Sequence, residues 1–535
     1  MEKSSRFTPL KHAMQGQSVP TAILNIGPMG KILKQLNVVQ CIPNDYSQFP
    51  AYDVSSADSN TSIFRRKRYV GEYLYKANPG GPKNFPSNLA GKYENLKIGL
   101  PVISVVVDEK DLYSPEKGII TNSRNKGREW ERLAYVSYYE YGNLLFTTNA
   151  GIRQHGGAYR VRKIMRSCRL YFRNDYGTNQ FKPGILFSPE TEPVKTLVIR
   201  HFGLGTCLAF DISRQIGAVV PGYKPVLFFL NGKYEGIKIL TEHLKKRQWR
   251  SHFGHDNFYF YRYRANNDEE SIKNYQKIAR WVRDPKVKMT MEQAGNFIDI
   301  DNFSRHLFSI VLCAKTRDWH QGAAVLDSSK PGAKWFWINW DMDRSFIWKN
   351  KTWDIIIDSE DPEAFHLHRI RSILFKRLLN ECPKYRKYYA RLVMDLLNHR
   401  VNGGFLIGRA NYYLRMARIL KLSKEELSNA RAMKDFFKNR PDFLRTQMQR
   451  FFETGKSLPC EVKGPPGIQY KIDGYSETNN YKGWYFKGEP IKIRIVSPHR
   501  DLLLHWLVNG KKITGNRLVY KIDSITSIEP VMKKI

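Results

Sequence analysis

The sequence predicts an α+β protein in which a strand-rich part is followed by a helical part and a small all-β module. Unbroken β-branched runs such as L-P-V-I-S-V-V-V-D, from residue 100, are typical of buried strands. Apolar residues then recur at helical spacing over residues 270–316 and most of 365–455. From residue 458 to 535, apolar and polar residues alternate as they do in antiparallel strands.

Composition limits the classes of function. The formal net charge is +37, which attracts polyanions such as nucleic acid, polyphosphate, anionic lipid or an acidic polymer without choosing among them. The six cysteines include no C-x-x-C pair, so neither a zinc site nor a disulfide framework is expected. No apolar stretch reaches the length of a transmembrane helix, and the N-terminus has no signal-peptide core. A cytoplasmic protein and one whose leader is missing from this sequence both remain open.

Changes in residue composition and apolar pattern along the chain predict three domains. Residues 1–97 form a β-rich extension, with short strands expected at Val38–Ile42 and Tyr69–Leu74. Residues 98–457 hold the strand-rich and helical parts together. Residues 458–535 form the small β module, which starts near the turn signal G-P-P-G.

Several separate strands are predicted in the strand-rich part. Strands are predicted at Arg166–Arg173, Thr196–Arg200 and Pro225–Leu230. Asn231-Gly232 predicts a tight hairpin turn, after which the return strand ends at Glu242. This glutamate stands beside a basic segment, where it pairs with a lysine or orients a cation toward ATP.

A glycine-rich segment, G-I-R-Q-H-G-G-A-Y-R, runs from Gly151 to Arg160. Gly156 and Gly157 would let the backbone approach a phosphate, while Arg153 supplies positive charge. The simpler interpretation is a glycine-rich hairpin.

The stretch from Lys315 to Phe346 carries the acidic residues of most interest. An amphipathic helix, with Asp301 placed to cap it, is predicted to end just before Asp318. The aromatic run Trp335–Trp340 predicts a buried strand that leads into the sequence W-D-M-D.

Helix, turn and strand would bring Asp318 close to Asp341. Two carboxylates placed in this way suit phosphoryl transfer, one orienting a hydroxyl and the other holding magnesium against ATP. The alternative is that these aspartates cap their elements and pair with Arg317 and Arg344.

Taken together, these segments resemble the spore-coat protein H (CotH) kinase-like family over residues 98–456. The resemblance is carried, in the family's order, by L-P-V-I-S-V-V-V-D, G-R-E-W-E-R, A-G-I-R-Q-H-G-G, R-S-C-R-L-Y-F-R-N-D-Y-G, Y-E-G-I-K-I-L-T-E and W-D-M-D. It implies an atypical, bilobal protein-kinase-like fold with an N-lobe antiparallel sheet and a helical C-lobe. It also implies phosphorylation of Ser or Thr on a protein substrate, using ATP and Mg²⁺ or Mn²⁺, at a spore coat or cell surface.

The resemblance also assigns roles to individual residues. Asp318 would be the catalytic carboxylate, and Asp341, with Asp343, would bind the metal. The residues implied on the nucleotide side are Arg166, Arg169, Glu242, Arg153, Gly156 and Gly157.

The sequence departs from the family pattern at two places. Arg166 stands where the family usually has a lysine, and an arginine does not substitute freely for that point charge. Gln321 follows Asp318 where family members often have an asparagine suited to a second metal. A pseudokinase that binds an acidic polymer or cell-surface ligand is therefore the first alternative. A kinase-like enzyme that transfers another ATP-derived group is the second.

Overall fold

The structure of the protein is a computed structural model. It describes residues 100–533 apart from 141–142, 157–166, 178–180, 182–193, 202, 263–264, 317–320, 358–368, 420–421, 479 and 497–501. The expected N-terminal extension, with its strands at Val38–Ile42 and Tyr69–Leu74, lies outside the described residues.

The protein has a mixed α and β architecture with several sheets, and it divides into two compact units. The first unit comprises Met1–Asp108, Tyr135–Thr148 and Leu227–Glu235. The second comprises Glu109–Ala134, Asn149–Val226 and Gly236–Ile535, and it contains the residues discussed below as a functional site.

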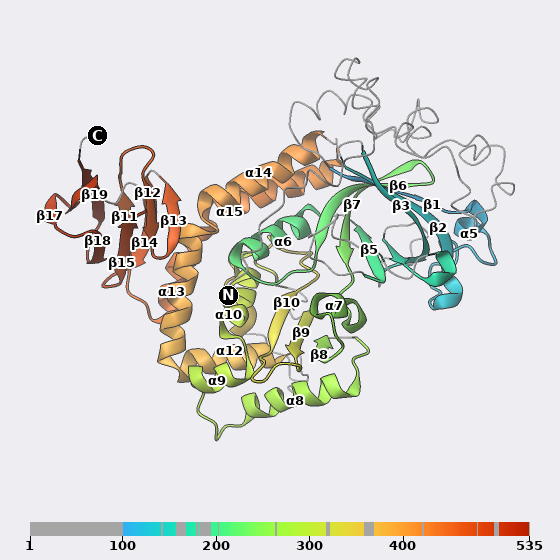
Figure 1. Cartoon of the computed structure of the whole chain (residues 1–535), viewed down its shortest axis with the longest axis horizontal. Coiled ribbons are helices and arrows are strands. Elements are labelled where there is room, and N and C mark those ends of the chain that lie inside the picture. Colours follow the sequence, from blue (N-terminus) through green and yellow to red (C-terminus); the bar gives the residue numbers. More distant parts are fainter. Residues whose placement is uncertain are drawn as a thin grey trace, which may run out of the picture. The chain divides into compact units, whose positions relative to one another are not determined.

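The strand-rich part forms a closed barrel with the order β1-β2-β3-β4-β5-β7-β6, where the resemblance implied an antiparallel sheet (Figure 1). β1 (Val102–Val106) pairs antiparallel with β2 (Arg132–Glu140) and parallel with β6 (Tyr223–Leu230). All residues of β1 are buried, as its unbroken apolar run predicts. Barrel closure depends on the parallel pairing of distant segments, which alternation along one strand does not encode.

Four barrel strands position the site. β3 (Asn143–Gln154), β4 (Cys168–Tyr171), β5 (Thr196–His201) and β7 (Lys233–Glu242) pair antiparallel in that order. The hairpin turn between β6 and β7 is the one predicted from Asn231-Gly232. Both turn residues have positive φ, 48° and 79°, as a type I′ turn requires.

The protein also contains a small sheet with the order β10-β9-β8 and the helix α10 (Ile300–Leu312). Its strands are β8 (Phe258–Arg262), β9 (Gly322–Asp327) and β10 (Phe336–Asn339). The predicted capping residue is wrong, because the side chain of Asp299, not Asp301, accepts a hydrogen bond from Asn302 N at 2.9 Å. Asp301 instead pairs with Arg305 one helical turn later.

The helical part follows the predicted periodicity (Figure 1). α15 is the longest described helix and begins with a capping box formed by Ser423 and Glu426. Among the described residues, no helix has the length and apolar character needed to cross a membrane. The other helices are α5 (Glu109–Tyr113), α6 (Leu204–Ile216), α7 (Lys246–Phe253), α8 (Glu269–Arg283), α9 (Met291–Phe297), α11 (Asp354–Ile357), α12 (Ile370–Glu381), α13 (Pro383–His399), α14 (Gly403–Ile419) and α15 (Lys424–Phe452).

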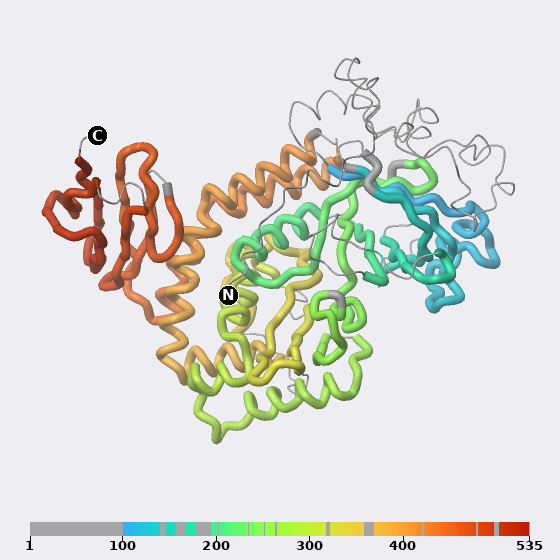
Figure 2. Tube along the Cα trace, in the orientation of Figure 1, coloured from blue at the N-terminus to red at the C-terminus, as the bar shows by residue number. Residues whose placement is uncertain are grey.

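The C-terminal module is all-β, as alternation predicts (Figure 1), and its trace is the orange-to-red end of the chain in Figure 2. Its two sheets have the orders β14-β11-β19-β16-β17 and β13-β12-β15-β18 and share an apolar core that includes Trp506. His399 at the end of α13 stacks on Tyr475 and Tyr481 of the module. The strands are β11 (Ser457–Val462), β12 (Gln469–Ile472), β13 (Tyr475–Thr478), β14 (Tyr481–Phe486), β15 (Pro490–Ile495), β16 (Leu503–Val508), β17 (Lys511–Ile513), β18 (Arg517–Lys521) and β19 (Thr526–Met532).

Candidate functional site

A group of cationic side chains, here called the basic cluster, gathers from β3, β4, β5, β8 and the segment after β7. Burial, followed by the charges of neighbouring guanidinium groups in the cluster, lowers the pKa of Lys245. The same two causes act on Arg262, whose pKa falls to about 10. Mutual repulsion of this size requires the groups to lie near one another. The basic cluster consists of Arg153, Arg169, Arg200, Lys245 and Arg262.

Strand register explains why residues so far apart in sequence share one site. Arg153 lies opposite Arg169 in the β3–β4 pair, and Arg169 lies opposite Val198 in the β4–β5 pair. Arg200 is two residues beyond Val198 and so points to the same face of the sheet. Alternation within three neighbouring strands therefore places three guanidinium groups on one side.

Asp341 supplies a carboxylate to this cationic region. It forms an ion pair with Arg200, and each of the two side chains is 20% exposed. Burial opposes its ionisation, but the charge and hydrogen bond of Arg200 outweigh that effect and hold the pKa of Asp341 below its usual value. The backbone of Asp341 is left-handed, with φ 56°, which turns the chain sharply as it leaves the small sheet.

Trp340 provides an aromatic surface for the same cations. The guanidinium of Arg200 lies 4.9 Å from its ring centroid, and that of Arg262 lies 5.5 Å from it. Cation–π contacts at these distances hold both arginines beside Asp341.

Two histidines complete the cationic surroundings. Burial, followed by the charge of Arg169, lowers the pKa of both His155 and His243 well below the ordinary value. Their ring centroids are 5.9 Å apart in an edge-on arrangement. Because both rings are then neutral at pH 7, His155 Nδ1 can accept the hydrogen bond from Arg169 Nη2 at 2.7 Å.

One hydrogen-bond donor of the Arg169 side chain is not used within the described part of the chain. Its Nη1 donates to the Tyr171 hydroxyl at 3.0 Å, whereas its buried Nε atom has no hydrogen-bond partner among the described residues. A buried donor without a partner is costly and points to a missing acceptor. An anionic oxygen would satisfy both this donor and the surplus positive charge.

Arg153 is held on another side by Glu131. Its Nε donates to Glu131 Oε2 at 2.9 Å, and its Nη1 donates to the carbonyl oxygen of Gly127 at 2.7 Å. Glu131 also accepts hydrogen bonds from Arg173 and Tyr176. This carboxylate fixes the orientation of Arg153 at the edge of the basic cluster.

Glu242 is fully buried and makes contacts different from those of Asp341. Its Oε2 accepts from Gly222 N at 2.7 Å, and its Oε1 lies 3.0 Å from His252 Nε2. The pairing with a nearby lysine that the sequence suggested is thus replaced by contact with a histidine of α7.

Asp343, two residues after Asp341, is held by a buried lysine. The fully buried Lys315 donates from Nζ to the Asp343 carbonyl oxygen at 2.6 Å and lies 3.2 Å from Asp343 Oδ1. The charge of Lys315 also acts on Asp341. Lys315 therefore links the two aspartates of W-D-M-D.

The remaining predicted residues divide into two groups. Asp318, Arg166 and Gly157 lie outside the described residues. Gly156 has φ 115°, and a Cβ added there would meet no atom within 4 Å. The positive φ, and not lack of space, is what favours glycine at this position.

Sequence reasoning missed several members of this site: Arg200, Lys245, Arg262, His155 and His243. Arg200 ends the apolar run T-L-V-I-R, so its charge was assigned to a strand end and to nothing further. Several predicted strands end with a cationic residue, and this repeated pattern could have predicted the site. Pairing between the strands then brings these cations together.

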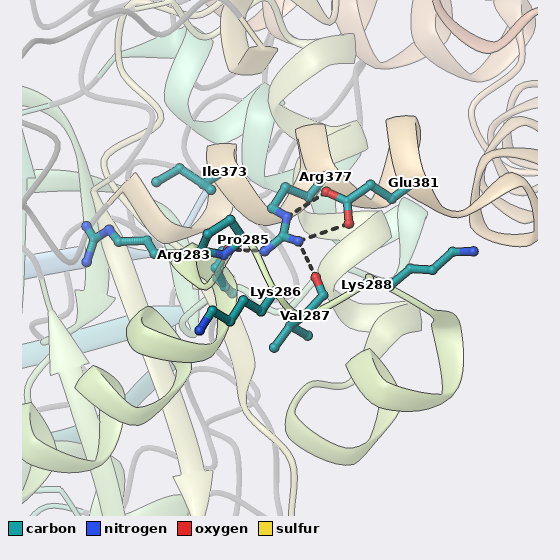
Figure 3. A pocket seen from close by; sticks show the side chains of 9 residues that line it. Arg283, Pro285, Lys286, Val287, Lys288, Ile373, Arg377 and Glu381 are labelled. Atoms are coloured by element: carbon teal, nitrogen blue, oxygen red, sulfur yellow. Dashed lines mark hydrogen bonds and ion pairs between the residues drawn. The ribbon is translucent and has the colours of Figure 1, made fainter.

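A hollow away from the basic cluster lies between the loop after α8 and helix α12, and Figure 3 shows its lining. Its volume is about 500 Å³. Arg377 spans it, donating to the carbonyl oxygens of Val282 and Asp284 at 2.8 Å each and pairing with Glu381. These bonds make Arg377 a structural brace for the loop. The lining residues are Val282, Arg283, Pro285, Lys286, Val287, Lys288, Ile373, Arg377 and Glu381.

Metal ligands are sparse in the described part of the chain. There, no group of three or more His, Cys, Asp or Glu side chains is arranged to hold a metal ion. Magnesium commonly uses one or two carboxylates together with substrate phosphates and water, so Asp341 satisfies the minimum requirement.

Comparison with known proteins finds a family match, over part of the chain. The model of the family described as CotH kinase protein matches residues 204–450. No curated protein matches the chain. The matched segment includes Glu242, Lys245, Arg262 and Asp341, whereas Arg153, Arg169 and Arg200 precede it. Over residues 204–450 the chain is therefore similar to the CotH kinase family.

Proposed function

We propose that this protein is an ATP- and Mg²⁺-dependent kinase that phosphorylates Ser or Thr of a protein substrate, with a bilobal kinase-like arrangement. The observation that carries the proposal is the ionised carboxylate of Asp341 set beside a basic cluster whose positive charge exceeds it. A nucleotide triphosphate bound with a divalent cation matches this combination of charges.

The triphosphate would occupy the basic cluster. Lys245 and Arg262 lie within repulsive range of other cations, and Arg169 Nε is buried without an acceptor. Phosphate oxygens would relieve the repulsion and accept the hydrogen bond. The planar guanidinium groups suit bidentate contacts with phosphate.

Asp341 would be the protein ligand of Mg²⁺, with Asp343 in support. When bound, the ion supplies neutralisation of the negative charge on the phosphates. Arg200 now holds Asp341 in its ionised form, which is the form able to ligate a cation.

Other assignments follow from the family resemblance. Asp318 would orient or deprotonate the acceptor hydroxyl, and Arg166 would contact a phosphate beside Gly156 and Gly157. Glu242 would support the nucleotide side of the site from the end of β7. Its contacts with Gly222 and His252 suit a positioning role.

Transfer of radiolabel from γ-labelled ATP tests the proposal, with the protein itself and dephosphorylated casein as acceptors. Asp318→Asn and Asp341→Asn should each lower transfer by at least about 100-fold, because the first removes the carboxylate that would act on the acceptor hydroxyl and the second removes the metal ligand. Asp435→Asn is the matched control, since Asp435 is exposed and pairs with Lys438 on α15. Full activity in the Asp341→Asn variant would overturn the assignment.

The basic cluster also supports a second candidate function, binding of phosphates without chemistry. A pseudokinase would bind Mg-ATP, or an acidic polymer, and transfer no label. A third candidate transfers a different ATP-derived group, such as adenylate. Mass spectrometry of the product separates these outcomes, because phosphate and AMP add different masses.

A further inference from the structure

The C-terminal module presents a face of unusual charge on its β13-β12-β15-β18 sheet. Along β15, Ile491, Ile493 and Ile495 are buried, so the residues between them point outward. In β18 the buried residue is Leu518. We call the outward set the cationic face: Lys471, Lys492, Arg494, Arg517, Val519 and Lys521.

Strand register arranges these residues as a planar grid. Lys471, Arg494 and Arg517 lie side by side on β12, β15 and β18, and Lys492 lies opposite Val519. Neighbouring strands are about 4.8 Å apart, and alternate residues of one strand are roughly 6.7 Å apart. The positive charges therefore spread in two dimensions.

Acidic side chains on the same strands and turns point elsewhere. Asp473 pairs with Arg391 of α13, and Glu477 lies 2.7 Å from His399. In the described part of the chain, none of the lysines and arginines of the cationic face forms an ion pair. The opposite sheet differs, because its Glu461 pairs with Lys482 at 2.9 Å.

The composition of the cationic face distinguishes among anionic partners. Val519, an apolar side chain that is 66% exposed, lies between Arg517 and Lys521 on the edge strand β18 and opposite Lys492 of β15. The face carries no aromatic ring on which nucleic-acid bases could stack. A planar array of cations around an exposed apolar side chain fits the headgroup region of a bilayer better than a single polymer strand.

We propose that the cationic face docks on a membrane surface that contains anionic lipid. The headgroup phosphates meet the lysine and arginine side chains, and Val519 enters the interfacial layer. This inference is independent of the proposed kinase activity, because it uses neither the basic cluster nor Asp341.

Co-sedimentation of the full chain with vesicles tests the inference, comparing 70% phosphatidylcholine and 30% phosphatidylglycerol with phosphatidylcholine alone. The test variant carries Lys492→Gln, Arg494→Gln and Arg517→Gln. The control carries Lys487→Gln, Lys511→Gln and Lys512→Gln, which remove the same charge from exposed positions in β17 and after β14.

Each cation at an anionic surface contributes about a fivefold gain in partitioning. The test variant should therefore bind the anionic vesicles roughly 100-fold more weakly, and the control variant less than about fivefold more weakly. Equal losses would show a general effect of net charge and overturn the proposal. So would failure of the unmodified chain to prefer anionic vesicles.

An environment-sensitive dye gives a second readout that separates a bilayer from a soluble polyanion. The dye is attached at Val519→Cys or, on the other sheet, at Leu504→Cys, with Cys41 changed to serine; the described native cysteines are buried. Vesicles should shift the emission at position 519 to shorter wavelength and leave position 504 unchanged. A shift at neither position, or tighter binding to soluble polyphosphate than to vesicles, would overturn bilayer docking.

Discussion

The ion pair between Arg200 and Asp341 gives the sharpest test of the site's electrostatics. A double-mutant cycle with Arg200→Gln and Asp341→Asn isolates its energy. Breaking fully buried pairs costs about 3–5 kcal/mol, whereas exposed pairs contribute about 1 kcal/mol or less. Each side chain here is 20% exposed, so we expect a coupling energy of about 2 kcal/mol.

The surrounding charges also predict which single variant is worse. After Arg200→Gln, the carboxylate of Asp341 still feels the charges of Lys315 and Arg262. After Asp341→Asn, Arg262 loses the negative charge that favours its protonated form while its repulsive neighbours remain. Asp341→Asn should therefore be the more destabilising change, by about 1 kcal/mol.

Urea unfolding followed by both fluorescence and circular dichroism measures the cycle, with coincident transitions required. The pKa of Asp341 lies below its usual value in the folded protein. Its stabilising effect is therefore present above the ordinary aspartate pKa and is lost only as pH falls through the folded value. The coupling should be the same at pH 8 and pH 5.5. A coupling below about 0.5 kcal/mol, or a larger loss from Arg200→Gln, would refute this account.

Other changes probe the remaining features of the protein. Lys245→Gln should weaken Mg-ATP binding at least about 10-fold by calorimetry, because it removes one cation of the basic cluster; unchanged binding would remove Lys245 from the site. Glu131→Gln should cost about 3 kcal/mol in urea unfolding, since it leaves two partly buried guanidinium groups without their buried carboxylate, and a cost under 1 kcal/mol would contradict this. Gly322→Ala should lower the melting temperature, because φ is 143° and the new Cβ would lie 2.5 Å from a carbonyl oxygen; an unchanged melting temperature would argue against the strand register described here. Burial and Asp473 raise the pKa of Asp395 to about 6 despite its ion pair, so its contribution to stability is full below about pH 3.8 and declines as pH rises through 6. Asp395→Asn should remove that decline and be more stable than the parent at pH 8 by about 1–3 kcal/mol, and an equal or lower stability at pH 8 would contradict the assignment.

Local chemistry in the sequence was enough to predict some of the regular elements. The hairpin at Asn231-Gly232 and the buried strand Val102–Val106 were predictable because each depends on residues adjacent in sequence. The cap at Asp299 was misassigned to Asp301 because both aspartates precede the same apolar pattern and only backbone geometry separates them. β9 was missed because Gly322–Asp327 reads as a short apolar passage before a turn.

The site was less predictable because its members meet through pairing between distant strands. Asp341 was selected from a local motif, and its ion-pair partner Arg200 lies 141 residues earlier in the chain. Nothing near Arg200 in the sequence distinguishes it from an ordinary strand-end cation. Only the register of β4 with β5 aligns Arg200 with Arg169 on one face.

The basic cluster departs from the pairing pattern found elsewhere in the protein, and that departure is the physical reason to assign function to it. One member of the basic cluster, Arg153, is paired with buried Glu131, which also pairs with Arg173. Around Asp341, by contrast, cations outnumber the carboxylate, and Arg169 Nε is left without an acceptor. A negatively charged ligand would offset the repulsion among these cations, which is why we propose that the cluster binds one. A bound polyphosphate supplies that charge only when ligand is present, and it would therefore stabilise the folded protein as it binds.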